Sequence, residues 1–416
     1  MTGVQTCALP ICSAVVVLQT NGTDADLLKI TGSADGMITL DVRAAGSNPT
    51  KKEIEVVNAE EASGDAEFKL AGGKVDIGAH RYGLTHGEDA NWYLKTEGEL
   101  TQTAKSVETM PALHLSIVNA GMNELRKRLG DLRSGNPDTP AGVWVRGYGK
   151  RLRVHERTGA RLNMLGMEGG IDAAAELFGG RTYLGVMGGY LSANDIRVFQ
   201  SGAPDAKGHT KTPVAGLYAT WLPHNSPWFV DLTARHFWVH TDLDNLSGGN
   251  RTNGYDIKRG FWAFTAETGR LFDFDAPRVL NAGSSLITFE PKIELRYVHG
   301  EAKDFTTDNG EIGSIDSTSS LVSRFNLQTS YLPEGRASNW KLFLELGLYN
   351  EWIGRTKVKF ADTRLTTSDL SGLGFEASLG FNAAVAENAY CYGAVTLEAG
   401  EAYTSYQLNA GLRVSF

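Results

Sequence analysis

Four side chains between residues 231 and 242 have the residue types needed for acid–base hydrolysis. They are Asp231, His236, His240 and Asp242, and a carboxylate beside an imidazole could activate a water molecule. In a strand, side chains five residues apart point to opposite faces, so Asp231 and His236 cannot meet unless a bulge intervenes. His240 and Asp242 share a face but lie near a predicted loop, where histidine is usually solvated. The segment therefore predicts no catalytic site.

Other reactive residues are sparse. The three cysteines, Cys7, Cys12 and Cys391, are an odd set that cannot form a disulfide framework, and their spacing fits no zinc site. The sequence contains no GxSxG, P-loop or HExxH motif. A net charge of −8 gives no reason to expect nucleic acid as a partner. We therefore expect a chain that is not an enzyme and that uses no cofactor or metal.

The composition leaves the choice between a soluble and a membrane protein open. The mean hydropathy of −0.22 is ordinary for a soluble protein, but transmembrane strands that alternate apolar with polar residues give the same value. No apolar run reaches the ~18 residues of a membrane-spanning helix. The 48 glycines suit bent or closely approaching strands, and 416 residues suffice for two domains. If this chain enters a membrane, it does so as strands.

Long strands with a period of two are predicted from residue 142 to the end. In residues 286–300, Ile293 and Leu295 share one face while Glu294 and Arg296 share the other. These strands exceed the usual five or six residues, and tryptophans lie near their ends. We count about twelve, an even number that closes a barrel without edges. The last strand has one apolar face that reaches the terminus: Tyr406, Leu408, Ala410, Leu412, Val414 and Phe416.

The first 134 residues differ from the rest. Residues 1–11 (MTGVQTCALPI) resemble translated sequencing adapter and lack the basic start of a signal peptide, so we set residues 1–12 aside and expect a truncated gene. Residues 13–110 predict short strands between Gly, Asn and Asp turns. Residues 111–134 change period: apolar residues recur every three or four positions, which predicts an amphipathic helix preceded by Pro111.

Several segments resemble bacterial autotransporters. DLLKITGSADG, EFKLAGGKVDIGAHRYGL and NWYLKTE are similar to the end of a pertactin-like passenger, and NELRKRLGDLR resembles the linker that plugs autotransporter barrels. WVRGYG, MEGGIDA, GLYATWL, FEPKIELRY and the terminal strand resemble barrel segments. The resemblance implies an all-β fold: residues 135–416 form a twelve-stranded antiparallel transmembrane barrel, 111–134 a helix in its pore, and 13–110 the end of a right-handed parallel β-helix.

The resemblance also implies a function and its residues. The barrel would insert in the outer membrane of a Gram-negative bacterium and export its own passenger to the cell surface, as a monomer that contacts lipid, periplasmic chaperones and the barrel-assembly machinery. The terminal apolar face would be the insertion signal, and residues 13–110 would be an autochaperone. Its core aromatics would be Phe68, Tyr82, Trp92 and Tyr93. What the missing passenger does stays open.

The pore helix would be held by charge. Its basic residues are Arg126, Lys127, Arg128 and Arg133, and buried cations need partners. The acidic candidates on polar strand faces are Glu168, Asp172, Asp231, Glu290, Glu294 and Glu345. One autotransporter subfamily cleaves itself between two adjacent asparagines in the pore. Here Glu124 follows Asn123, so the second asparagine is missing and we expect no efficient self-cleavage.

Two rivals remain from the sequence alone. A porin- or receptor-like barrel with an unrelated soluble domain would share the alternating strands, but a basic helix directly before the first strand favours a plug over an open pore. A soluble adhesin with two β-domains would also alternate. Solubility of residues 135–416 without detergent would favour the adhesin.

Overall fold

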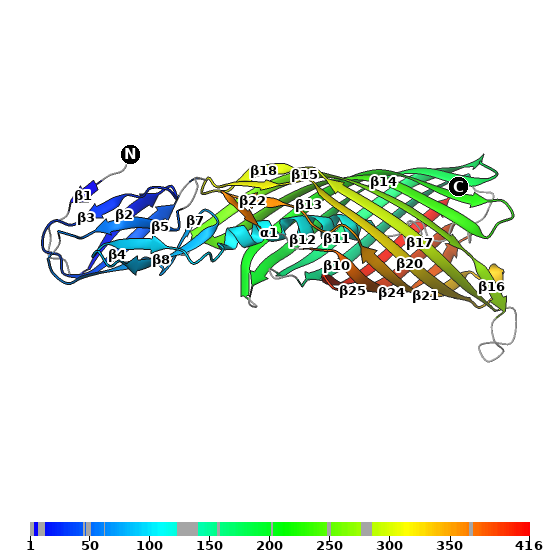
Figure 1. Cartoon of the computed structure of the whole chain (residues 1–416). Helices are drawn as coiled ribbons and strands as arrows, with labels where there is room; N and C mark the ends of the chain where they lie inside the picture. Colours follow the sequence, from blue (N-terminus) through cyan, green and yellow to red (C-terminus); the bar gives the residue numbers. More distant parts are fainter. Residues whose placement is uncertain are drawn as a thin grey trace.

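The computed structural model describes residues 4–6, 13–44, 46, 51–61, 63–122, 140–155, 159–200, 203–247, 251–275, 285–365 and 369–416. Figure 1 shows an elongated molecule with small N-terminal sheets at one end, a large barrel at the other, and a helix that runs from the first into the second. Within these ranges, no helix combines the length and apolarity needed to cross a membrane.

A closed antiparallel barrel occupies the C-terminal two thirds of the chain. Each of its twelve strands pairs with the next, and the last strand pairs with the first. The strands are β10 (Ala141–Val154), β11 (Gly159–Leu177), β12 (Gly180–Gln200), β13 (Ala203–Pro223), β14 (Trp228–Ser247), β15 (Arg251–Arg270), β17 (Leu286–Gly300), β20 (Thr318–Leu332), β21 (Trp340–Glu351), β24 (Gly372–Ala386), β25 (Ala389–Gly400) and β26 (Tyr403–Ser415). A short strand, β16 (Phe272–Asp275), adds to β17. The predicted twelve-stranded barrel is confirmed.

The outer surface of the barrel carries an apolar band. On β14 the outward side chains from Trp228 to Trp238 include Leu232, and these three are 47–49% exposed. Ten residues rise about 33 Å, which a strand tilt near 45° reduces to roughly 25 Å, the height of a lipid-facing band. Beyond Trp238 the outward residues of β14 are His240 and Asp242. The predicted alternation is therefore correct, and the band marks the lipid contact.

The two ends of the barrel differ. At the end away from the N-terminal sheets, β11 and β12 are joined by two residues, Phe178 and Gly179. At the other end the chain forms a four-stranded cap sheet of β18 (Lys303–Thr306), β19 (Ile312–Ile315), β22 (Val358–Phe360) and β23 (Thr363–Leu365). Short turns on one side and longer extensions on the other are typical of outer-membrane barrels, whose long side faces outward.

Two stacks of parallel strands form most of the N-terminal part. One stack is β2 (Ser13–Thr20), β4 (Gly36–Ala44) and β6 (Ala66–Leu70), and the other is β1 (Val4–Thr6), β3 (Leu27–Lys29) and β5 (Glu53–Asn58). Three strands then reverse the chain against β5: β7 (Val75–Ile77), β8 (His80–His86) and β9 (Trp92–Lys95). Cys7 and Cys12 lie outside the described residues.

The core between these stacks contains two of the four predicted aromatics. Phe68 and Tyr82 are buried, and the Tyr82 hydroxyl donates a hydrogen bond of 2.6 Å to the Lys51 carbonyl. Trp92 packs half-buried against Phe68, with ring centroids 5.5 Å apart. Tyr93 is not a core residue: it follows Trp92 on the opposite face of β9, and its hydroxyl donates to the exposed Asp89. Period two separates these neighbours.

Replacing Tyr82 by Ala is expected to unfold the N-terminal sheets selectively. Loss of a buried aromatic typically costs about 3–5 kcal/mol, much of the free energy of unfolding of so small a unit. The expected readout is rapid protease cleavage within residues 13–100 while the barrel keeps its heat-modifiable migration. Tyr93→Ala is the matched control and should leave protease resistance unchanged. Equal resistance of the Tyr82 variant would contradict a cooperative core.

The single α-helix of the described residues, α1 (Gln102–Gly121), begins earlier than predicted. The Thr101 side chain caps it by accepting from the Ala104 amide at 3.1 Å, and Pro111 lies inside the helix instead of preceding it. Burial explains the difference, because Val107 and Met110, before the proline, are fully enclosed, and packing outweighs the lost hydrogen bond. Residues 123–139 lie outside the described part of the chain.

Candidate functional site in the barrel lumen

Helix α1 is enclosed by the barrel wall and the cap sheet. Seventeen of its twenty residues are buried, far more than the one face of an ordinary surface helix. Its polar groups bond to the wall: Ser106 lies 2.9 Å from the Tyr255 hydroxyl, and His114 lies 3.1 Å from the Thr241 hydroxyl. Residues 102–121 are therefore not a solvated surface helix between two domains.

Three arginines of the wall hold the C-terminal end of α1. Arg235 Nη1 donates to the Gly121 carbonyl at 2.5 Å, and Arg146 Nη2 donates to the same oxygen at 3.4 Å. Arg296 Nη2 donates to the Met122 carbonyl at 2.8 Å. The last carbonyls of a helix lack intrahelical partners and carry the negative end of the helix dipole. These three arginines, which we call the arginine clamp, come from β14, β10 and β17. They donate hydrogen bonds to the free carbonyls and place positive charge at the negative end of the helix.

Glutamates of the wall compensate the clamp. Glu168 accepts from Arg146 at 3.0 Å and from Arg235 at 3.3 Å, and Glu294 accepts from Arg296 at 2.8 Å. All these side chains are at most 3% exposed. Removing one partner of such a buried pair leaves an uncompensated charge, which typically costs 3–5 kcal/mol. Two carboxylates therefore offset most of the charge of the three arginines, and the carbonyls at the helix end take up part of the rest.

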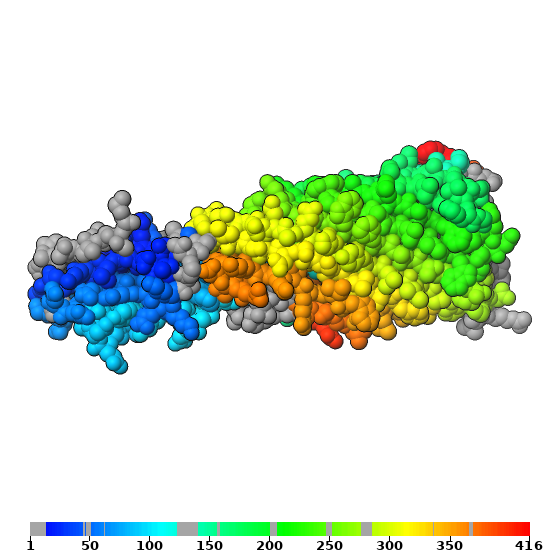
Figure 2. Space-filling model, turned by 45° about the horizontal axis from the view of Figure 1, so that its top comes forward, coloured from blue at the N-terminus to red at the C-terminus, as the bar shows by residue number. Residues whose placement is uncertain are grey.

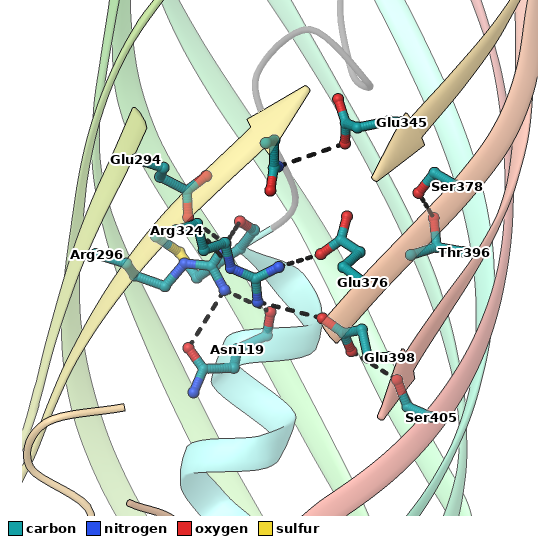
Figure 3. Close-up of polar contacts among 12 residues, drawn as sticks. Asn119, Glu294, Arg296, Arg324, Glu345, Glu376, Ser378, Thr396, Glu398 and Ser405 are labelled. Atoms are coloured by element: carbon teal, nitrogen blue, oxygen red, sulfur yellow. Dashed lines mark hydrogen bonds and ion pairs between the residues drawn. The ribbon is translucent and has the colours of Figure 1, made fainter. Parts of the chain in front are cut away.

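A second network lines the lumen beside the helix end. Arg324 pairs with Glu376 and, at 3.2 Å, with Glu398, which also accepts from Lys150 at 2.5 Å and from Ser405 at 2.6 Å. Figure 3 shows Arg324, Glu376 and Glu398 converging from different strands beside the last turn of α1. Asn119 of this turn faces Arg296. Because acids and bases alternate around the wall, the lumen is polar and nearly neutral.

All six predicted acidic residues lie on the inner face of the wall. Glu168, Asp172, Asp231, Glu290, Glu294 and Glu345 are at most 3% exposed. Their partners include cations of the wall: Asp172 accepts from Arg413 at 2.6 Å, and Glu345 pairs with Lys292. The predicted helix residues Asn123, Arg126, Lys127, Arg128 and Arg133 lie outside the described residues, so pairing with them stays a prediction.

The clamp is the functional element that sequence reasoning missed. The alternation of residues 286–300 predicts a polar strand face for Arg296, whereas no prediction from the sequence includes Arg146 or Arg235. A sequence signal for both exists: each lies on the inward-facing side of a long alternating strand, where a cation is unusual without a partner. What the pattern could not supply was the helix end that they bind.

The predicted insertion signal lies on the lipid side. Tyr406, Leu408, Leu412 and Phe416 are 39–63% exposed on the outer face of β26, and Val414 is half-buried on the same face. The inward residues of this strand, Gln407 and Asn409, are buried. The face that was predicted from alternation is therefore continuous with the apolar band.

The Asp and His residues of β14 do not form a hydrolytic site. Asp231 points into the lumen and His236 outward, as predicted. His240, Asp242 and Asp256 cluster on the outer surface with ligand atoms within 4.8 Å, close enough to hold a metal ion. His240 pairs with Asp256, and His209 lies 3.0 Å from Asp242, so ion pairing accounts for this exposed cluster.

A twelve-stranded barrel with an apolar outer band and a helix clamped in its lumen defines the translocator class of outer-membrane protein. The family model described as "Autotransporter beta-domain" matches residues 143–396, and the model described as "Pertactin" matches residues 12–96. The chain belongs to the autotransporter beta-domain family. It is an outer-membrane translocator for passenger export, and the porin-like alternative is not better supported.

Curated relatives agree with this assignment. The chain is 28% identical to autotransporter CRAC of Citrobacter rodentium, over 94% of this chain and 25% of the relative. It is 27% identical to the pertactin autotransporter of Bordetella bronchiseptica, over 86% of this chain and 43% of the relative. The chain thus spans between a quarter and under half of these relatives.

Solved structures show the same fold. The transport unit of the autotransporter AIDA-I from Escherichia coli matches with a TM-score of 0.57 at 15% identity, covering 74% of this chain and 98% of that one. The beta domain of the Bordetella autotransporter BrkA matches with a TM-score of 0.52 at 20% identity, covering 67% of this chain and 100% of that one.

Proposed function

We propose that this translocator keeps its passenger tethered at the cell surface through α1, which the arginine clamp holds in the lumen. The carrying observation is that three wall arginines bind two consecutive carbonyls at the end of the helix. A lumen that accommodates one helix has no room for a folded domain. The passenger therefore crosses unfolded, and α1 closes the pore afterwards.

We infer that residues 13–100 are the last coils of a right-handed β-helix and the folding nucleus of the passenger; the expected boundary at residue 110 moves back because α1 begins at Gln102. In-register parallel pairing of β2, β4 and β6 is the arrangement that stacked coils require, and the pertactin model match covers the same region. In a stack each coil contacts only its neighbours, so a preformed coil can template the next. Folding outside the membrane would then favour export without a nucleotide.

The partners that we propose follow from the outer surface. Outer-membrane lipid contacts the apolar band. The barrel-assembly machinery would recognise the exposed face of β26. Periplasmic chaperones would bind the unfolded chain before that step. We propose a monomeric barrel without catalytic activity of its own; the activity of a longer passenger is a separate question.

A display experiment tests export of the N-terminal part. An epitope placed before residue 13, behind an export signal, should be labelled and cut by protease on intact cells. The Arg235→Gln, Arg296→Gln double variant should still display the epitope, because the clamp acts after export. Labelling that requires permeabilised cells would show that the chain does not export its N-terminal part.

We expect the passenger to stay covalently attached. Asn123 is followed by Glu124, so the adjacent asparagine of the self-cleaving subfamily is missing. N-terminal sequencing of the barrel purified from cells should find no new end at Glu124, and Asn123→Asp should not change the fragment pattern. A Glu124 terminus that Asn123→Asp abolishes would overturn this expectation.

A further inference from the structure

Three arginines lie side by side on the outer surface of the barrel. Arg153 of β10 is directly opposite Arg161 of β11, and Arg161 is directly opposite Arg197 of β12. The residues that flank them along the strands, such as Leu152 and Val198, are buried on the lumen side, so the arginines face outward. We call these three residues the arginine row.

The row has an excess of positive charge. Arg151 lies two residues before Arg153 on the same face, and Lys207 of β13 is directly opposite Arg197. Asp195 lies among the arginines: it accepts from Arg197 at 2.8 Å, and the charges of Arg161 and Arg151 also act on it. Like charges directly opposite across strands destabilise a sheet. Among the described residues, five cations outnumber the two carboxylates beside them, Asp195 and Asp244, which favours an external anion.

The row lies just beyond the apolar band. Arg151 is opposite Tyr406, which is 58% exposed on the lipid face, and Arg153 lies one pleat farther out. Leu165, 67% exposed, is the last large apolar residue of β11 before the row. Figure 1 places the connected ends of β10 and β11 at the barrel end that carries the N-terminal sheets, the cell-surface end.

The neighbouring strands β14 and β15 carry a mixed set of outward charges in place of the excess of arginine. Asp242 and Asp256 are directly opposite each other on the outer face, and the exposed Lys211 and Lys258 are both opposite His240, two residues before Asp242. Asp244, opposite Lys207, ends the row on that side. An unspecific ring of charge would not have this asymmetry. The basic side is therefore a localised site at the level of lipid headgroups.

We propose that the arginine row, with Arg151 and Lys207, binds the phosphate groups of a phosphorylated glycolipid in the outer leaflet. The planar guanidinium donates two parallel hydrogen bonds to phosphate oxygens, and adjacent strands about 4.8 Å apart let two arginines bracket one phosphate. Arg153 also lies over the Phe199 ring at 5.7 Å, which limits its freedom before binding. Bound phosphates would relieve the repulsion in the row and fix the depth of the barrel.

Lipid retention by the refolded full chain tests this. The probe is lipid A with both phosphates, against dephosphorylated lipid A, with retained lipid counted by native mass spectrometry at rising salt. Each cation near an anionic surface contributes about a factor of five in affinity, so Arg153→Gln, Arg161→Gln and Arg197→Gln together should lower retention about a hundredfold. A matched triple on the exposed cap sheet, Lys357→Gln, Lys359→Gln and Arg364→Gln, should bind like the parent chain.

Heat-modifiable migration separates misfolding from lost binding, since the three arginines lie on the outer face, outside the buried lumen, and their substitution should leave it unchanged. Equal retention by the row variant and the cap-sheet variant would overturn the proposal. So would equal binding of dephosphorylated lipid A, or displacement of lipid A by an equal concentration of inorganic phosphate, which would indicate a free-phosphate site.

Discussion

Leu412→Asp is expected to remove most of the barrel from the outer membrane. Leu412 lies on the lipid face of β26, 39% exposed, opposite Val145 of the first strand and Cys391 of β25. A charge on this face costs about 2–4 kcal/mol for Arg or Lys near mid-membrane, and somewhat less for Asp. The cost falls on the strand that closes the barrel. We expect outer-membrane levels to fall more than tenfold, with loss of heat-modifiable migration.

Asn409→Asp is the matched control for this substitution. It places the same charge on the same strand, but Asn409 faces the lumen, where Arg146 and Lys150 of the paired strand also point inward. Membrane levels should stay near those of the parent. Deleting Phe416 should act like Leu412→Asp, because it shortens the same apolar face. Similar effects of the lipid-side and lumen-side charges would refute the membrane-facing role of this strand.

Deleting residues 102–122 is expected to turn a quiet barrel into a conducting one in planar bilayers. The helix fills the lumen and its end is bound by three arginines, so its removal leaves a polar, water-accessible channel. The Arg235→Gln, Arg296→Gln variant should conduct intermittently, because the helix loses its strongest anchors while the other packing remains. Single-channel current at fixed voltage measures both effects.

Arg413→Gln controls for the general loss of a lumen cation. Arg413 pairs with Asp172 at 2.6 Å, and none of its described hydrogen bonds is to α1. This variant should remain quiet. Unchanged conductance after deletion of the helix would show that another segment closes the pore, and frequent opening of the Arg413 variant would remove the clamp as the specific cause.

The lipid and lumen faces of the barrel could be predicted because apolar and polar residues alternate within each strand. In β17, the apolar Ile293 is exposed on the lipid side and the charged Glu294 is buried on the lumen side. Because side chains alternate along a strand, placing one residue places all the others. The terminal strand followed the same rule. Its pairing with β10 could not be read from either strand, because register depends on a partner far away in sequence.

The helix shows where local rules fail. Proline usually precedes or ends a helix, so the sequence predicts a helix boundary at Pro111. In the structure Met110 and Pro111 are enclosed by the barrel, and burial keeps the helix continuous. The clamp was missed for the same reason, since Arg235 gains its role from a carbonyl 114 residues earlier. Composition and periodicity describe a strand, not what enters the lumen beside it.

The seam between β10 and β26 has a kinetic consequence. Gly142 pairs with Ser415 and Val154 with Tyr403, so the first and last strands of the barrel meet over the longest sequence separation of any strand pair in the barrel. Contacts of high contact order form slowly, because the chain between them must be ordered first. Hairpins such as β11 and β12 can form early, whereas the seam closes last. Until the seam closes, the edges of β10 and β26 stay unpaired. During that time the lumen of the barrel is still open along one side.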